Sequence, residues 1–171
     1  EHLIRVAQGH GEDASCVSPQ DYAERQIKFL WDCIMPEGME AVGSLGCLRI
    51  EVRSAQDLIA GDWLGTSDPY VQVSLGLLRR RTHTVERDCS PRWRCTLLLP
   101  VNRQHAAQDL EISVWDEDQN RALRGADDFL GRVVLRMEHL LAGPHELRGH
   151  PLADVKRGRL WARLSFEPVR Q

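Results

Sequence analysis

Two acidic residues six positions apart, Asp62 and Asp68, border a short stretch that also holds two large apolar residues, Trp63 and Leu64. The flanking stretches alternate apolar and polar residues, as half-buried strands do. We therefore expect an exposed loop between two strands, with carboxylates at its base and apolar side chains at its tip. Carboxylate oxygens suit a hard cation, and an apolar tip suits insertion into a membrane.

A second acidic stretch lies further along the chain. Asp116, Glu117 and Asp118 directly follow another alternating stretch, and Asp127 and Asp128 directly precede the next one. They would stand at the two ends of a loop. If this loop lies beside the first, five carboxylates converge and repel one another strongly unless a cation binds. Ca²⁺ accepts 6–8 oxygen ligands in irregular geometry, so a calcium site is the predicted chemistry.

The spacing of Asp116, Asp118 and Asn120 also resembles the start of an EF-hand loop. The sixth position of that loop needs Gly for a sharp turn and is Arg121 here, and the twelfth position is Asp127 rather than Glu. The flanking residues indicate strands rather than helices. The EF-hand alternative is therefore rejected.

Charge and cysteine content bound the class of protein. Residues 1–46 hold 8 acids and 3 bases, whereas residues 47–171 hold 17 acids and 19 bases. The second part is therefore a basic body with a local acidic pole, which suits an anionic surface.

The chain has five cysteines, an odd number, and they include no Cys-x-x-Cys pair. This argues against a disulfide framework or a zinc site and indicates a reducing, cytoplasmic compartment.

Residues 1–45 are expected to form an N-terminal extension with one helix over about 19–35. Ser18 is placed as N-cap and Pro19 at the first helical position, and apolar residues follow at helical spacing. This helix either binds a membrane or a protein partner, or packs on its own domain. Packing is favoured because the polar face has only Arg25 and Lys28 as bases, and membrane-surface helices are richer in bases.

From residue 46 to 171 the hydrophobic period changes to two. Clear strands are expected over 48–52, 71–75, 110–114 and 160–166, and weaker ones over 82–85, 95–100 and 132–136. Leu152 marks an eighth short strand, and a short helix is expected near 137–141. This pattern predicts an all-β fold, an eight-stranded antiparallel β-sandwich preceded by the helical extension.

In order and spacing, four pieces of the sequence resemble the C2 domain family over about residues 46–169. They are Gly46-Cys47-Leu48-Arg49-Ile50-Glu51-Val52, then Asp62-x-x-Gly65-x-Ser67-Asp68-Pro69-Tyr70, then Pro91-x-Trp93, and finally Asp116-x-Asp118 with Asp128-Phe129-Leu130-Gly131. The resemblance implies a C2-like Greek key. It also implies the type II strand order, because residues 48–52 are the first family strand and 160–166 the last.

The resemblance also implies the ligands of a calcium site. The carboxylates are Asp62, Asp68, Asp116, Asp118 and Asp128, and the backbone carbonyl of Glu117 is a further ligand. Asp128 is preferred to Asp127 because it stands three residues before Gly131. Trp63 and Leu64 are the expected membrane-inserting residues.

The third family loop is longer than usual, because residues 120–126 separate its acids. Leu123 is expected as a second inserting tip, with Arg121 and Arg124 placed to meet phosphates. The alternative is that the longer loop holds Asp127 and Asp128 too far from Asp62 to share a cation.

A basic group is expected beside these loops. It consists of Arg79, Arg80, Arg81, His83, Arg92 and Arg94. On adjacent strands they would form a patch for anionic lipid headgroups, phosphatidylserine or polyphosphoinositides, because guanidinium matches phosphate bidentately. An ordinary solvated strand face is the alternative. Nucleic acid is disfavoured because only Trp93 could stack on bases.

The sequence contains no Gly-x-Ser-x-Gly, P-loop or His-Glu-x-x-His motif, and we expect no enzyme activity. The expected function is calcium-dependent phospholipid binding. It is the role of a targeting module within a larger signalling or membrane-trafficking protein, recruited from the cytoplasm to the membrane surface. The alternative is a calcium-independent module that uses the basic strands for protein interaction or phosphoinositide targeting.

Overall fold

The computed structural model describes residues 44–59, 66–117 and 126–168. The chain divides into two units, Glu1–Val42 and Gly43–Gln171, and every described residue belongs to the second. The helix predicted over about 19–35 lies outside the described residues.

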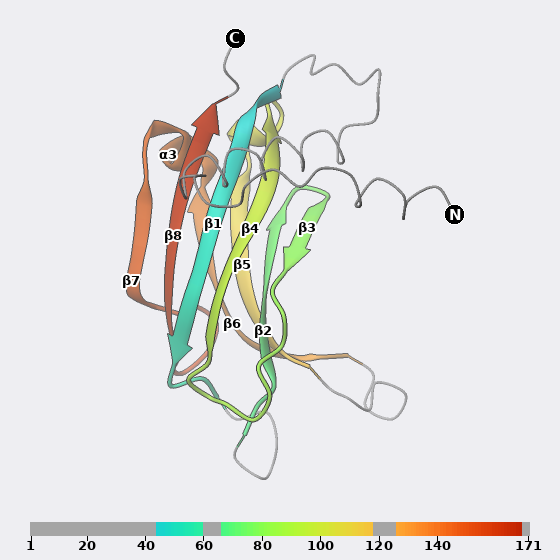
Figure 1. The fold of residues 1–171 in the computed structure, drawn as a ribbon, viewed down its shortest axis with the longest axis vertical. Helices are drawn as coiled ribbons and strands as arrows, with labels where there is room; N and C mark the ends of the chain where they lie inside the picture. Colours follow the sequence, from blue (N-terminus) through green and yellow to red (C-terminus); the bar gives the residue numbers. More distant parts are fainter. Residues whose placement is uncertain (1–43, 60–65, 118–125, 169–171) are drawn as a thin grey trace, which may run out of the picture. The chain divides into compact units, whose positions relative to one another are not determined.

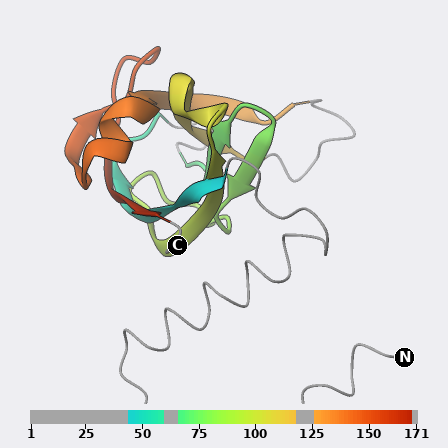
Figure 2. The same cartoon turned by 90° about the horizontal axis from the view of Figure 1, so that it is seen from above.

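The described residues form two four-stranded antiparallel sheets that face each other (Figures 1 and 2). The strands are β1 (Ser44–Gln56), β2 (Pro69–Leu75), β3 (Leu78–Arg81), β4 (Arg92–Asn102), β5 (Asp109–Asp116), β6 (Asp128–Arg136), β7 (His145–Pro151) and β8 (Arg159–Pro168). A short 3-10 helix, η1 (His105–Ala107), and the helix α3 (Met137–Ala142) complete the described elements. The first sheet has the order β4-β1-β8-β7 and the second β3-β2-β5-β6. The predicted β-sandwich is confirmed.

The alternating residues that predicted the strands supply the core. Successive side chains of a strand point to opposite faces, so every second residue of β1, β2, β5 and β8 turns inward. Ile50, Val73, Ile112 and Leu164 are fully buried between the sheets. Strand β1 pairs with β4 and β8 rather than with β2, which follows it in the chain. This connectivity agrees with the expected type II order.

Two weaker strand predictions are wrong in position. The strand after β2 is β3, which ends at Arg81, and not residues 82–85. Past Arg81 the pairing with β2 becomes irregular. The amide of Val71 donates to the Oγ1 atom of Thr82, while the amides of Thr82 and Val85 donate to the carbonyls of Val71 and Pro69. Leu152 lies after β7 instead of within a strand. Strand β7 was missed because Leu147 is its only buried large apolar side chain. The helix expected near 137–141 is confirmed as α3.

The register of the second sheet positions the acidic residues. Strand β5 lies between β2 and β6, with Pro69 opposite Asp116 and Asp116 opposite Asp128. Because the pairs are antiparallel, the start of β2, the end of β5 and the start of β6 meet at one end of the sheet, at the lower end in Figure 1. We call this end of the sheet, with Asp68, Asp116 and Asp128, the acidic edge.

Candidate functional site

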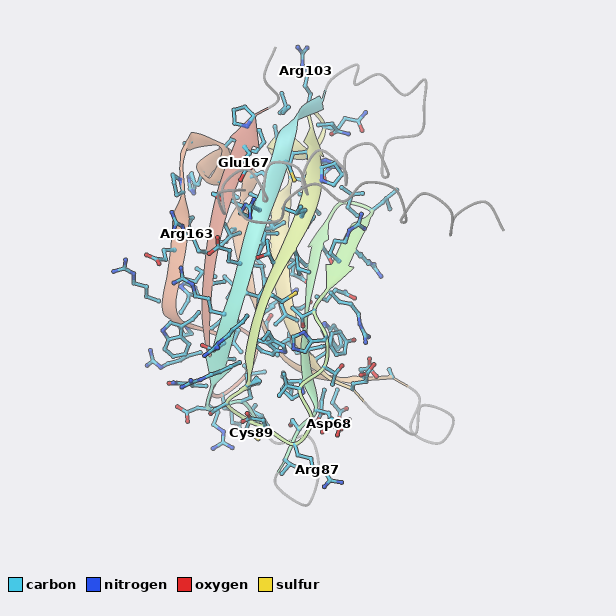
Figure 3. The ribbon with its side chains drawn as sticks, in the orientation of Figure 1. Asp68, Arg87, Cys89, Arg103, Arg163 and Glu167 are labelled. Carbon is cyan, nitrogen blue, oxygen red and sulfur yellow. The ribbon has the colours of Figure 1, made fainter. Side chains whose placement is uncertain are left out.

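Three of the predicted ligand residues come together at this edge of the sheet. Asp68 stands immediately before β2, Asp116 is the last residue of β5, and Asp128 is the first residue of β6. The two acidic stretches of the sequence therefore share one end of the sandwich, as the sequence predicted. Figure 3 shows Asp68 at this end of the domain.

Backbone hydrogen bonds orient the two carboxylates that lie closest. The amide of Asp68 donates to Oδ1 of Asp116 over 2.6 Å, and the amide of Arg87 donates to Oδ1 of Asp68 over 2.7 Å. The amide of Glu117 donates to the carbonyl of Asp68 over 2.9 Å. These bonds connect the start of β2, the end of β5 and the loop between β3 and β4. They fix where both acids stand relative to the backbone.

Hydrogen bonds from two buried side chains fix the segment that carries Asp68. Ser67 is 1% exposed, and its hydroxyl donates to the carbonyl of Ile59 over 3.0 Å. Trp93 is 3% exposed, and its indole N–H donates to the carbonyl of Pro69 over 3.1 Å. The Ser-Asp-Pro-Tyr sequence is therefore fixed on both sides of the acid. The Trp of the Pro-x-Trp motif supports the first acidic loop from the opposite sheet.

The two ends of the second acidic stretch, Glu117 and Asp127, have partners on β2, on β3 and in the chain after β3. The Glu117 carboxylate forms an ion pair with Arg81 over 2.9 Å and accepts a hydrogen bond from Thr84 over 2.5 Å. The Tyr70 hydroxyl donates to Oδ2 of Asp127 over 2.8 Å. The Glu117 side chain is thus directed to Arg81 and Thr84, and the ligand role that the resemblance implies for its backbone carbonyl stays a prediction.

The remaining predicted site residues near these loops lie outside the described residues. They are Asp62, Trp63, Leu64, Asp118 and Leu123. Within residues 44–59, 66–117 and 126–168, no group of three or more His, Cys, Asp or Glu side chains is arranged to hold a metal ion. The structure thus places four residues of the predicted set, Asp68, Asp116, Glu117 and Asp128, and their role as ligands stays a prediction.

The donors that are described fit a hard cation. They are three carboxylates and one backbone carbonyl, all oxygen ligands of the kind that Ca²⁺ takes. The contact between the Asp68 amide and the Asp116 carboxylate brings these two residues together. The donor types suit Ca²⁺, and calcium binding by these residues stays a prediction.

The predicted basic patch is divided between the two sheets. Arg79, Arg80 and Arg81 lie on β3, whereas Arg92 and Arg94 lie on β4. Strands β3 and β4 follow each other along the chain but belong to different sheets, so they are not hydrogen-bonded neighbours. Strand β4 pairs with β1 instead of continuing the β2–β3 hairpin. The two edge strands still contact each other, and a common basic patch stays a prediction. His83 follows β3 and is exposed.

Sequence reasoning missed several residues that support the acidic edge. They are Tyr70, Thr84 and Arg87. It also assigned Arg81 to lipid headgroups, whereas Arg81 pairs with Glu117. Only Tyr70 carried a signal, through its place in the Asp-Pro-Tyr motif.

Comparison with known proteins agrees with this geometry. The family model described as "C2 domain" matches residues 46–152. The chain belongs to the C2 domain family. Among the described residues of this C2 domain, none forms a helix long and apolar enough to cross a membrane.

Curated relatives include proteins with several such domains. The chain is 30% identical over 161 residues to Multiple C2 and transmembrane domain-containing protein 2 of Mus musculus, covering 91% of this chain and 18% of that protein. It is 38% identical over 128 residues to Extended synaptotagmin-1 of Homo sapiens, covering 71% of this chain and 11% of that protein. The chain thus spans less than a fifth of the length of either relative.

Solved structures share the fold. A calcium-bound structure of two C2 domains of Extended-Synaptotagmin 2 matches with a TM-score of 0.63 and 28% identity, covering 72% of this chain and 46% of that one. Human GIVD cytosolic phospholipase A2 matches with a TM-score of 0.63 and 20% identity, covering 75% of this chain and 17% of that one, which indicates a common fold alone.

Proposed function

We propose that this C2 domain binds anionic phospholipid membranes in a calcium-dependent manner. The observation that carries the proposal is the contact between Asp68 and Asp116, two acids that stand 48 residues apart in the sequence. In the proposed site the carboxylates of Asp62, Asp68, Asp116, Asp118 and Asp128 and the carbonyl of Glu117 hold Ca²⁺.

The acidic edge and the loop tips have separate roles in this mechanism. Without a cation the carboxylates repel an anionic leaflet. Bound Ca²⁺ supplies positive charge and coordination positions for lipid phosphate or carboxylate oxygens. Trp63, Leu64 and Leu123 then enter the bilayer. The domain thereby recruits a larger protein from the cytoplasm to a membrane surface, in signalling or membrane trafficking.

Sedimentation with phosphatidylserine vesicles tests the calcium dependence. The chain is expected to sediment with vesicles in Ca²⁺ and to stay in solution in chelator. The double substitution Asp116→Asn with Asp118→Asn is expected to remove the difference. Asp109→Asn is the matched control, because Asp109 is an exposed acid at the opposite end of β5. Equal binding in Ca²⁺ and chelator would falsify the proposal.

Paired substitutions test the inserting tip separately. Trp63→Ala with Leu64→Ala is expected to reduce vesicle binding and leave the heat of Ca²⁺ binding unchanged. Leu77→Ala is the control, because Leu77 is fully exposed in the β2–β3 turn at the other end of the sheet. If the Leu77 substitution lowers binding as much as the paired one, insertion by the tip is wrong.

A second candidate function is calcium-independent targeting through the basic strands. Arg79 and Arg92 favour it, because both are exposed and neither belongs to an ion pair found among the described residues. Calorimetry with Ca²⁺ on the whole chain separates the two candidates. No heat and no thermal shift at millimolar Ca²⁺, with retained binding to phosphoinositide vesicles or a protein partner, would favour the second. A partner for the predicted helix over 19–35 stays a prediction.

A further inference from the structure

Arg81 is the last residue of β3, and it contacts Glu117 and Tyr70 beside the long loop between β5 and β6. Its register partner on β2 is Gln72. This places the Arg81 side chain on the outer face of the second sheet, because the neighbouring Val71 and Val73 are buried in the core. Tyr70 also lies on that face, two residues before Gln72.

At the start of the third loop, Arg81 holds Glu117. The guanidinium lies 2.9 Å from Oε1 of Glu117, while the Thr84 hydroxyl donates to Oε2. Both carboxylate oxygens of Glu117 therefore have partners from β3 and the residues after it. The amide of Glu117 is held in addition by the carbonyl of Asp68. These contacts fix the side chain and the backbone of the residue whose carbonyl is a proposed ligand.

At the end of the third loop, Arg81 acts through Tyr70. The Arg81 guanidinium carbon lies 4.4 Å from the centroid of the Tyr70 ring, a distance at which cation and ring attract. Tyr70 is 6% exposed, so the ring has little freedom to move. Its hydroxyl donates to Asp127 over 2.8 Å, and Asp127 directly precedes the proposed ligand Asp128. One arginine thus contacts the start of the loop directly and its end through a single buried ring.

We propose that Arg81 is a positioning residue of the calcium site rather than a lipid contact. This inference rests on the proposed function and names how the two ends of the long third loop are held beside Asp68. Arg81, Tyr70, Glu117 and Asp127 form what we call the Arg81 cluster. Closing a flexible loop costs more entropy as the loop lengthens. Contacts at its two ends fix their separation whatever the length between them.

Arg79 provides a matched comparison on the same strand. It points to the same face, opposite Ser74, and is exposed. Arg79 lies two residues before Arg81 on β3, and it takes part in no ion pair found among the described residues. Substituting Arg79 removes one positive charge from β3, as substituting Arg81 does, without touching the Arg81 cluster. The two substitutions thus separate positioning from general electrostatic attraction.

The experiment compares Arg81→Gln with Arg79→Gln in two measurements without lipid. Hydrogen exchange of the Glu117 amide is measured in chelator, and Ca²⁺ affinity is measured by calorimetry. Arg81→Gln is expected to speed the exchange and to weaken Ca²⁺ binding, each by about fivefold, from the loss of an ion pair and a cation–ring contact. Arg79→Gln is expected to change neither. Arg81→Lys, which keeps the charge, is expected to restore part of both.

The exchange measurement needs no metal, so the inference and the proposed function can fail separately. If the unsubstituted chain binds no Ca²⁺, the proposed function fails, while the exchange rates still decide whether Arg81 holds Glu117. If Arg81→Gln leaves exchange and affinity unchanged and lowers vesicle binding as much as Arg79→Gln, Arg81 is a lipid contact and the inference is overturned. If Arg81→Gln does not fold, thermal unfolding of Arg81→Lys, Glu117→Gln and their combination gives the coupling of the pair. Additive effects in that cycle would also overturn the inference.

Discussion

The backbone amide of Asp68 donates a hydrogen bond to Oδ1 of Asp116 over 2.6 Å. The sheet register dictates this contact, because Pro69 lies directly opposite Asp116. Two acids from distant parts of the chain are therefore held together by backbone geometry. A binding site whose ligands are already oriented loses less conformational entropy when it binds. The contact fixes the Asp116 carboxylate to the backbone at the start of β2, so this acid has little freedom to move away from Asp68.

Substituting Asp68 separates its charge from its hydrogen bond. The carboxylate accepts a bond from the amide of Arg87, and Asn keeps an oxygen that can accept the same bond, whereas Ala does not. Both Asp68→Asn and Asp68→Ala are expected to weaken Ca²⁺ binding in calorimetry. In denaturant unfolding with chelator, Asp68→Asn is expected to be near neutral and Asp68→Ala to lose about 1 kcal/mol. An Asp68→Asn variant that binds Ca²⁺ normally would show that Asp68 is no ligand.

Trp93, on β4, fixes the residue that follows Asp68. Its indole N–H donates to the carbonyl of Pro69, and the side chain is 3% exposed. Trp93→Phe is expected to lower the free energy of unfolding by about 1–3 kcal/mol, because it leaves a small cavity and removes one of the two donors to the Pro69 carbonyl, the Val85 amide being the other. Trp115→Phe is the control. Trp115 is half-buried, and the Ser113 hydroxyl to which its indole N–H donates keeps the Gln72 carbonyl as its own acceptor, so a smaller loss is expected. Equal losses for the two variants would contradict a special role for Trp93.

The strands with strict alternation were predicted because their inner residues form the core. Residues 48–52, 71–75, 110–114 and 160–166 all lie in strands whose inner side chains are buried. Strand β7 could not be found this way, because Glu146, Arg148 and His150 are exposed and Gly149 gives no side chain to the pattern. Strand β3 ends before the predicted span, because the Thr82 side chain takes the amide of Val71 and residues 82–85 bond to β2 irregularly.

The acidic edge was predictable in part for a similar reason. Asp68, Asp116 and Asp128 each stand at the end of a recognisable strand, so the topology brings them to one place. The role of Arg81 was not predictable, because it depends on Tyr70 and Glu117, which are distant in sequence from one another and from Asp127. An arginine in a basic run has the same sequence signal whether it faces solvent or an acidic loop.

The thiol of Cys47 gives a pH dependence of stability. Burial, aided by the negative charge of Glu167, raises its pKa from 9.0 to about 11. The folded state therefore keeps this proton at pH values where the unfolded state has lost it. Stability is fully present below pH 9 and declines as the pH rises toward about 11. Denaturant unfolding should show a steeper decline for the unsubstituted chain than for Cys47→Ser. Parallel declines in the two chains would mean that the thiol contributes nothing.

Gly131 lies on β6 near the acidic edge, in a place where a larger residue would not fit. It has φ +118, and an added Cβ would lie 2.7 Å from both Leu152 Cβ and Val155 Cγ2. Gly131→Ala is therefore expected to cost about 2–4 kcal/mol in denaturant unfolding, from backbone strain and overpacking together. Gly143→Ala is the matched control, because an added Cβ there meets nothing within 4 Å. It is expected to change stability by less than about 0.5 kcal/mol.

The position of Gly131 extends this prediction to the calcium site. It lies opposite Val114 in the register, beside the irregularity between Val114 and Trp115, and three residues after Asp128. Strain at Gly131 cannot be relieved toward Leu152, which is 5% exposed and packed in the core. Relief must move the start of β6, and with it Asp128. Gly131→Ala is therefore expected to weaken Ca²⁺ binding as well as stability, whereas Gly143→Ala changes neither. A Gly131→Ala variant that is destabilised but binds Ca²⁺ with unchanged affinity would indicate that Asp128 is not needed for the site.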